Sequence, residues 1–126
     1  MRGSEVIVIP GRPVTKKNSS QIVVNSKTGR PFIMPSKQFK EYQAAAGWHI
    51  RCKGRKIATK VNVKCVYYMP TRHKVDLANL IAATCDILVH YGVIEDDNSE
   101  IVASHDGSFV GYDKENPRAE ITIEEV

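Results

Sequence analysis

The sequence predicts one α/β domain over residues 1–126, with a mixed β-sheet and two main helices on it. A chain of 126 residues can bury a core without disulfide bonds. Its 42% hydrophobic and 25% charged residues are typical of a globular protein. Segments with strand and helix patterns follow in the order βββαβαββ, with no repeat or linker between them. Strands that alternate with helices favour an α/β fold.

The first half of the chain contains three predicted strands and one helix. Residues 5–10 are a short run rich in Val and Ile, which is typical of a buried strand. Residues 21–34 predict a hairpin, because Gly29 lies in a turn segment between two apolar stretches. A helix is predicted over residues 37–52, with Ser36 as its N-cap, because apolar residues recur there at helical spacing.

The second half begins with a strand and a longer helix. Residues 58–70 alternate between apolar and polar side chains, which predicts a strand that ends at Pro70. The next helix covers residues 75–92, where Asp76 can cap the start and Gly92 can end it. The remaining segments are a turn over 93–100, a strand-like segment with turn signals over 101–113, and a final alternating strand over 118–125.

Charge is distributed unevenly along the chain. Residues 1–75 contain 16 Lys and Arg against 2 Asp and Glu, which gives +14, whereas residues 76–126 contain 2 against 12, which gives −10. This asymmetry suggests a polyanion as partner of the first half. A basic surface around a compact acidic site is also the layout of a metal-dependent nuclease. The alternative is that the two halves only attract each other on folding.

Cysteine content and hydropathy predict a reducing, cytoplasmic location. Cys52, Cys65 and Cys85 form an odd set without a CxxC motif, so we expect reduced thiols that fill the core. No run of about 18 apolar residues could span a membrane, and the N-terminus lacks the apolar region of a secretory signal.

Acidic residues concentrate around the second predicted helix. At 100° per residue, Asp76, Asn79 and Asp86 lie within one 80° arc beside the apolar face. Glu95, Asp96 and Asp97 follow the helix, so Asp76 can converge with Asp96 or Asp97 if the chain turns back. Converging carboxylates repel each other, and Mg²⁺ or Mn²⁺ would relieve the repulsion. The alternative is an ordinary N-cap followed by a solvated turn.

Residues 74–102, KVDLANLIAATCDILVHYGVIEDDNSEIV, resemble the signature of RusA-type Holliday junction resolvases. That family has a D-L-D-N-L segment at a helix start and a D-D pair after the helix. The opening VIVIPGRPVTKKNS also resembles the N-terminal strand and Asn-containing loop of the family, with Asn18 as the Asn, and residues 118–125 resemble its last strand. The matching positions of the signature are Asp76, Leu77, Asn79, Leu80, Asp86, Asp96 and Asp97.

The resemblance implies a homodimeric, Mg²⁺- or Mn²⁺-dependent endodeoxyribonuclease, encoded by a bacterium or a phage. Such an enzyme resolves four-way DNA junctions by paired symmetric nicks, in recombination and repair. It implies Asp76, Asp96 and Asp97 as catalytic residues and metal ligands, with Asp86 as a further possible ligand.

Two positions depart from the family pattern. Ala78 replaces the second Asp, and Ala82 replaces a Lys one helical turn later. Asp86, Asp96 or Glu95 could complete the metal site. Lys74 or Lys16 could replace the cation. A junction-binding protein with weak or absent cleavage is therefore an alternative, and a protein–protein adaptor is a third.

Basic residues on two segments are the predicted DNA contacts. One group lies on the loop after the first strand, a second lies just before Asp76, and one amide belongs to the helix start. These residues are Arg12, Lys16, Lys17 and Asn18, then Arg72 and Lys74, and Asn79. Their alternative role is a solubilising surface. Trp48 is expected to anchor the core or an interface.

Overall fold

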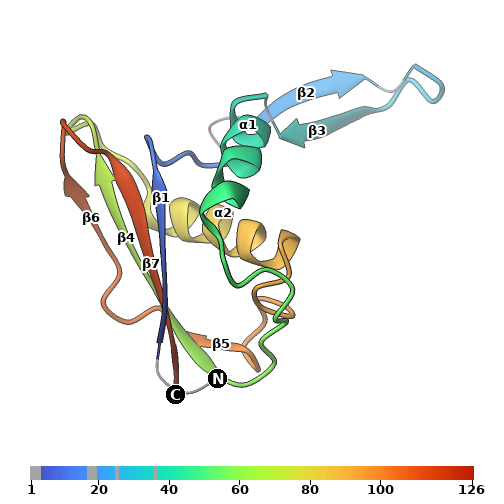
Figure 1. The fold of residues 1–126 in the computed structure, drawn as a ribbon. Coiled ribbons are helices and arrows are strands. Elements are labelled where there is room, and N and C mark those ends of the chain that lie inside the picture. The colour runs from blue at the N-terminus through green and yellow to red at the C-terminus, as the bar shows by residue number, and fades with distance from the viewer. Residues whose placement is uncertain (1–3, 17–19, 25, 36) are drawn as a thin grey trace.

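The computed structural model describes residues 4–16, 20–24, 26–35 and 37–126 and forms one mixed sheet with two helices and a separate hairpin (Figure 1). The elements are β1 (Ser4–Pro10), β2 (Ser20–Val24), β3 (Pro31–Pro35), α1 (Lys37–Ala46), a 3₁₀ helix η1 (Gly47–His49), β4 (Val61–Met69), α2 (Leu77–His90), β5 (Val102–Ser104), β6 (Phe109–Tyr112) and β7 (Arg118–Glu125). The predicted α/β fold with a mixed sheet and two main helices is therefore confirmed.

The sheet has the order β1–β7–β4, with β5 and β6 both on the other edge of β4. β7 pairs antiparallel with both β1 and β4, whereas β5 and β6 run parallel to β4. The segment 101–113 thus contains two short strands where the sequence predicted one. Its turn over 105–108, where the Ser108 N–H donates to His105 O at 3.2 Å, separates them.

The first helix ends at Ala46, earlier than residue 52, and the next residue, Gly47, lies against an aromatic ring. The Tyr91 hydroxyl donates to the carbonyl of Gln43 at 2.7 Å. A Cβ at residue 47 would lie 2.6 Å from that hydroxyl, so only glycine fits there. After η1 the chain becomes extended at Ile50, which is buried in the core. Ser36, the predicted cap, lies outside the described residues.

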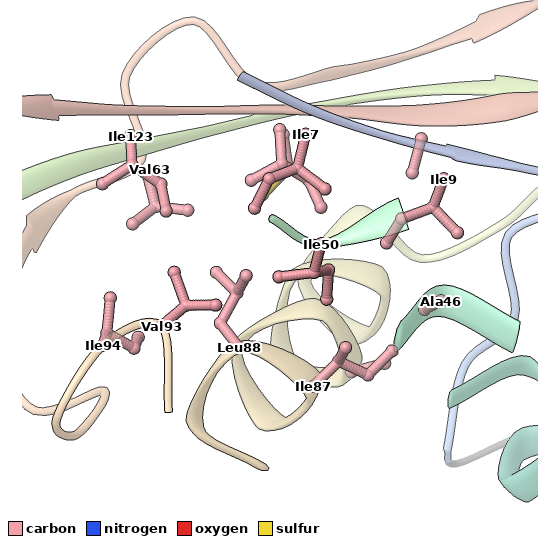
Figure 2. Close-up of a cluster of buried hydrophobic side chains, with 14 of the residues drawn as sticks. Ile7, Ile9, Ala46, Ile50, Val63, Ile87, Leu88, Val93, Ile94 and Ile123 are labelled. Atoms are coloured by element: carbon pink, nitrogen blue, oxygen red, sulfur yellow. The ribbon is translucent and has the colours of Figure 1, made fainter. Parts of the chain in front are cut away.

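One face of the sheet packs against α2 to form the core (Figure 2). Alternate residues of β1, β4 and β7 point to this face, as the period of a strand requires. The buried side chains include Ile7 and Ile9 of β1, Val63 of β4, Ile123 of β7, and Ile87 and Leu88 of α2. The three cysteines are free and buried, as expected.

The two ends of α2 are fixed by the residues that the sequence indicated. Asp76 is the N-cap, and its Oδ1 accepts the Asn79 N–H at 3.3 Å. At the other end Gly92 has a φ of 65°, and Val93 N–H donates to the Leu88 carbonyl at 2.9 Å. The chain then reverses, and Ile94 is buried and forms a bridge with Ile57. The acidic turn is therefore anchored to the body of the domain.

The predicted hairpin is formed by β2 and β3, which pair antiparallel and extend away from the sheet and the helices in Figure 1. Gly29 has a φ of 70° in its turn, a conformation that glycine adopts without strain. Within the described part of the chain, no helix has the length and apolar character needed to cross a membrane.

Candidate functional site

Asp96 is held by hydrogen bonds within the acidic turn. Asp96 accepts hydrogen bonds from the Asp97 N–H at 2.8 Å and from Asn98 Nδ2 at 3.1 Å. These bonds hold the pKa of Asp96 below its ordinary value. With Glu95 and Glu100, Asp96 lines a depression of about 430 Å³, and Asp97 is not among its lining residues. Asp96 therefore stabilises the turn that carries Asp97.

Asp97 and Asp86 both influence a buried thiol of α2. The thiol of Cys85 on α2 has its pKa raised to about 12, chiefly by burial, and the charges of Cys65, Asp97 and Asp86 add to the effect. The carboxylates of Asp97 and Asp86 thus act on one buried atom. Asp76 precedes Cys85 by nine residues, which at 1.5 Å per residue places it about 13 Å away along the helix axis. The convergence of Asp76 with Asp97 stays a prediction.

Lys16 connects the basic loop after β1 to α2. Its Nζ lies 2.9 Å from Asp86 Oδ2 and 5.8 Å from the centre of the Phe39 ring. Both partners of the ion pair are about two-fifths exposed, so the pair contributes less than about 1 kcal/mol to stability. Its importance lies in its position, because it holds an ammonium group at the helix that carries the acidic residues.

The carboxylates suit a hard divalent ion but do not form a complete cage. Within residues 4–16, 20–24, 26–35 and 37–126, no three His, Cys, Asp or Glu side chains lie close enough together to hold a metal. Mg²⁺ is usually held by one or two carboxylates together with waters and substrate phosphates. Asp76 and Asp97, which are both exposed, supply the oxygen donors that such an ion takes.

A cationic cleft of about 250 Å³ lies between the loop after β1 and the segment that leads into α2. Its charged and polar lining residues come from both segments and from α1, and the other residues that line it are apolar. The lining residues are Arg12, Pro13, Val14, Thr15, Gln38, Met69, Thr71, His73, Lys74 and Val75. Two predicted DNA contacts, Arg12 and Lys74, are therefore brought together next to Asp76.

The other predicted DNA contacts are distributed differently. The Arg72 guanidinium stacks over Tyr112, 4.2 Å from its ring centre, and Arg72 does not line the cleft. Asn79 donates its backbone N–H to the cap, and its side chain is half-buried. Lys17 and Asn18 lie outside the described residues.

Comparison with known proteins identifies the same family as the sequence motifs in residues 74–102. Residues 10–124 match the family model described as Endodeoxyribonuclease RusA. The chain belongs to the RusA family. A crossover junction endodeoxyribonuclease RusA from Aquifex aeolicus (strain VF5) is 31% identical over 88 residues, which are 68% of this chain. The match spans 66% of that relative, just under two thirds of its length. The resemblance predicted from residues 74–102 is therefore confirmed as a family relationship.

Two features of the site were missing from the sequence-based prediction. The Lys16–Asp86 ion pair joins residues 70 positions apart, and no local pattern indicates such a pair. The cleft also includes Thr71, from the segment after β4, and Gln38 of α1, which are 33 positions apart in the sequence. The basic residues of the loop after β1 and those just before Asp76 were the signals for the cleft.

Proposed function

We propose that this RusA-family chain is a metal-dependent, structure-selective endodeoxyribonuclease that resolves four-way DNA junctions by paired symmetric nicks, in recombination and repair. One observation carries the proposal beyond the family match. Asp76 caps α2, the Lys16 ammonium pairs with Asp86 on the same helix, and a cationic cleft adjoins the start of that helix. Phosphate-binding groups next to carboxylates are what cleavage of a DNA strand requires.

We assign Asp76 and Asp97 as the ligands of Mg²⁺ or Mn²⁺. Such an ion, when bound, activates water and stabilises charge on the phosphoryl group. Asp96 supports the site by holding the turn through its bonds to Asp97 N–H and Asn98. Asp86 is engaged by Lys16, so we assign it to positioning that ammonium group.

Lys16 is the best-placed replacement for the Lys that the family pattern has at Ala82. Residues 82 and 86 are four apart on α2 and so lie on one face of the helix. An ammonium group bound to Asp86 Oδ2 therefore occupies the same side of the helix as position 82. There it can stabilise negative charge on a cleaved phosphate. Lys74, which lines the cleft, is assigned to DNA binding.

The substitution Asp97→Asn tests this function. It should abolish Mg²⁺- or Mn²⁺-dependent nicking of a four-way junction, because the amide removes a charged ligand. DNA binding should be kept or strengthened, since a negative charge near the phosphates is lost. Asp106→Asn, on an exposed turn between β5 and β6, is the matched control and should cleave normally. Full activity of Asp97→Asn would overturn the assignment.

A junction-binding protein with weak or absent cleavage is the second function, and one observation favours it. Ala78 and Ala82 are both exposed on α2 where the family has an Asp and a Lys, and the described residues contain no group of three metal-ligating side chains. Salt-dependent binding to a four-way junction without nicking in Mg²⁺ or Mn²⁺ would select this function.

Two coordinated nicks require two active sites, so we propose a homodimer. The free edge of β1 is the surface that we assign to the second copy. Val6 and Val8 on this end strand are 63% and 43% exposed, and Trp48 beside it is 88% exposed. An edge strand can pair antiparallel with its own copy across a two-fold axis, which is the geometry of a symmetric dimer.

A further inference from the structure

We propose that the cationic cleft binds one unstacked nucleotide of the DNA strand that is to be cut. The phosphate lies at Arg12 and Lys74 on the rim, and the sugar and base lie against the apolar floor. The choice of DNA as the polymer rests on the proposed function. The binding chemistry rests on the cleft itself.

The cleft combines a charged rim with an apolar floor. Arg12, Thr71, His73 and Lys74 are exposed, whereas the apolar Pro13 and Met69 and the polar Thr15 are buried. Guanidinium and ammonium groups donate charge-assisted hydrogen bonds to phosphate oxygens. None of the lining residues is acidic. The cleft thus offers anion binding and apolar contact together, which matches a nucleotide better than a bare phosphate ion.

The size of the cleft limits the ligand to a single nucleotide. Pockets for drug-sized molecules have volumes of about 300–1,000 Å³, and this one has about 250 Å³. A base can enter such a space only after leaving the stack of its helix. Unstacking costs least where base pairing is already interrupted, as at the crossover of a four-way junction. The cleft would therefore favour junctions over continuous duplex.

The cleft lies next to the proposed cutting site through the chain itself. Val75 lines the cleft, and Asp76 follows it, so their Cα atoms are about 3.8 Å apart. On the opposite wall, Thr15 lines the cleft and Lys16, which follows it, reaches Asp86. A strand held in the cleft would continue toward Asp76 and the Lys16 ammonium. The bound nucleotide is therefore a neighbour of the phosphate to be cut.

Nucleotide binding can be measured directly, without cleavage. Full-length Asp97→Asn protein would be titrated, without divalent metal, with deoxycytidine 5′-monophosphate and separately with inorganic phosphate, and followed by ¹H–¹⁵N NMR. The nucleotide should shift amides within residues 12–15 and 71–75 and bind more tightly than phosphate. Equal affinity for the two would identify a simple anion site and overturn the proposal. Shifts elsewhere would overturn it as well.

Two variants separate the rim from the floor. Arg12→Ala combined with Lys74→Ala should weaken nucleotide binding by at least about tenfold, because two charge-assisted contacts are lost. The control removes two exposed cations outside the cleft, Lys53→Ala with Lys60→Ala, and should leave binding unchanged. Thr71→Trp keeps the rim charges but fills the cleft, so it should block the nucleotide and spare phosphate. Unchanged nucleotide binding by Thr71→Trp would exclude the cleft.

The same variants test the role of the cleft on DNA. Neutral methylphosphonate linkages placed one at a time in a four-way junction should weaken binding most at one position beside the cut. That penalty should vanish in the Arg12→Ala, Lys74→Ala double variant, and a persistent penalty would contradict the proposal. The result is independent of nuclease activity. If the protein binds the nucleotide but never cleaves a junction, the proposed nucleotide site stands and the proposed nuclease function is refuted. If the variants cleave junctions as fast as the unchanged protein, the nuclease function stands and the proposed nucleotide site is refuted.

Discussion

Asp76 has two possible roles, helix cap and metal ligand, and two substitutions separate them. Its Oδ1 accepts the Asn79 N–H at 3.3 Å at the start of α2. Asn caps helices about as well as Asp, so Asp76→Asn should lose only the helix-dipole interaction, about 0.3–1 kcal/mol. Asp76→Ala also loses the cap, about 1 kcal/mol more, which lowers the melting temperature by roughly a further 2–8 °C in a domain of this size.

The effect of the two substitutions on metal-dependent cleavage should differ from their effect on stability. Both substitutions remove the carboxylate, so both should reduce junction nicking equally. The loss should exceed the about 10–100-fold cost of removing a group that only supports a ligand. Thermal unfolding and a nicking assay on the same preparations provide the comparison. If Asp76→Asn cleaves normally, Asp76 only caps the helix and its assignment as a ligand is refuted. If the nicking rate is instead lower in Asp76→Ala than in Asp76→Asn, in the order of their melting temperatures, the loss of activity is an effect on folding.

Three further predictions concern other parts of the chain. Lys16→Ala should slow nicking while changing the free energy of unfolding by less than about 1 kcal/mol, and Lys16→Arg should recover part of the nicking rate. Equal nicking rates in the unchanged protein and in both variants would show that Lys16 is not part of the site. Trp48→Asp should give a folded monomer in sedimentation velocity, where an unchanged dimer would exclude the β1 edge as the interface. Cys85, with its pKa raised to about 12, should be neutral at pH 8 and react with iodoacetamide much more slowly in native than in unfolded protein. Rapid native labelling of Cys85 would contradict its buried position.

Much of the fold followed from local patterns. The alternation in β4 and β7 predicted their buried faces, because a central strand contacts the core with every second residue. Asp76 and Gly92 fixed the ends of α2, because capping chemistry is local. The close contact of Gly47, just after α1, with Tyr91 was not predictable, because the two residues are 44 positions apart. The pairing of β6 with β4 likewise depends on tertiary contact, as its four residues carry a weak strand signal.

The candidate site was predicted in composition but not in arrangement. The sequence indicated Asp96 and Asp97 as a pair of carboxylates, yet Asp96 accepts hydrogen bonds from the Asp97 N–H and from the Asn98 side chain within the turn. Arg72 and Lys74 are two residues apart but serve different surfaces, because Tyr112 holds the guanidinium of Arg72. In short irregular segments such local bonds decide direction, and residue spacing does not reveal them.

The distribution of ion pairs bears on why a basic chain concentrates acids in one place. If the two halves only neutralised each other, salt bridges would join them. Among the ion pairs that the described residues form with one another, Lys16–Asp86 alone joins residues 1–75 to residues 76–126. Arg55 pairs with Glu5 within the first half, and Arg118 pairs with two acids of the second. Within the described part of the chain, most of these ion pairs therefore join residues of the same half. The ion pair that joins the halves among the described residues lies at the candidate site, where Lys16 brings a cation of the basic half to α2, which carries Asp86.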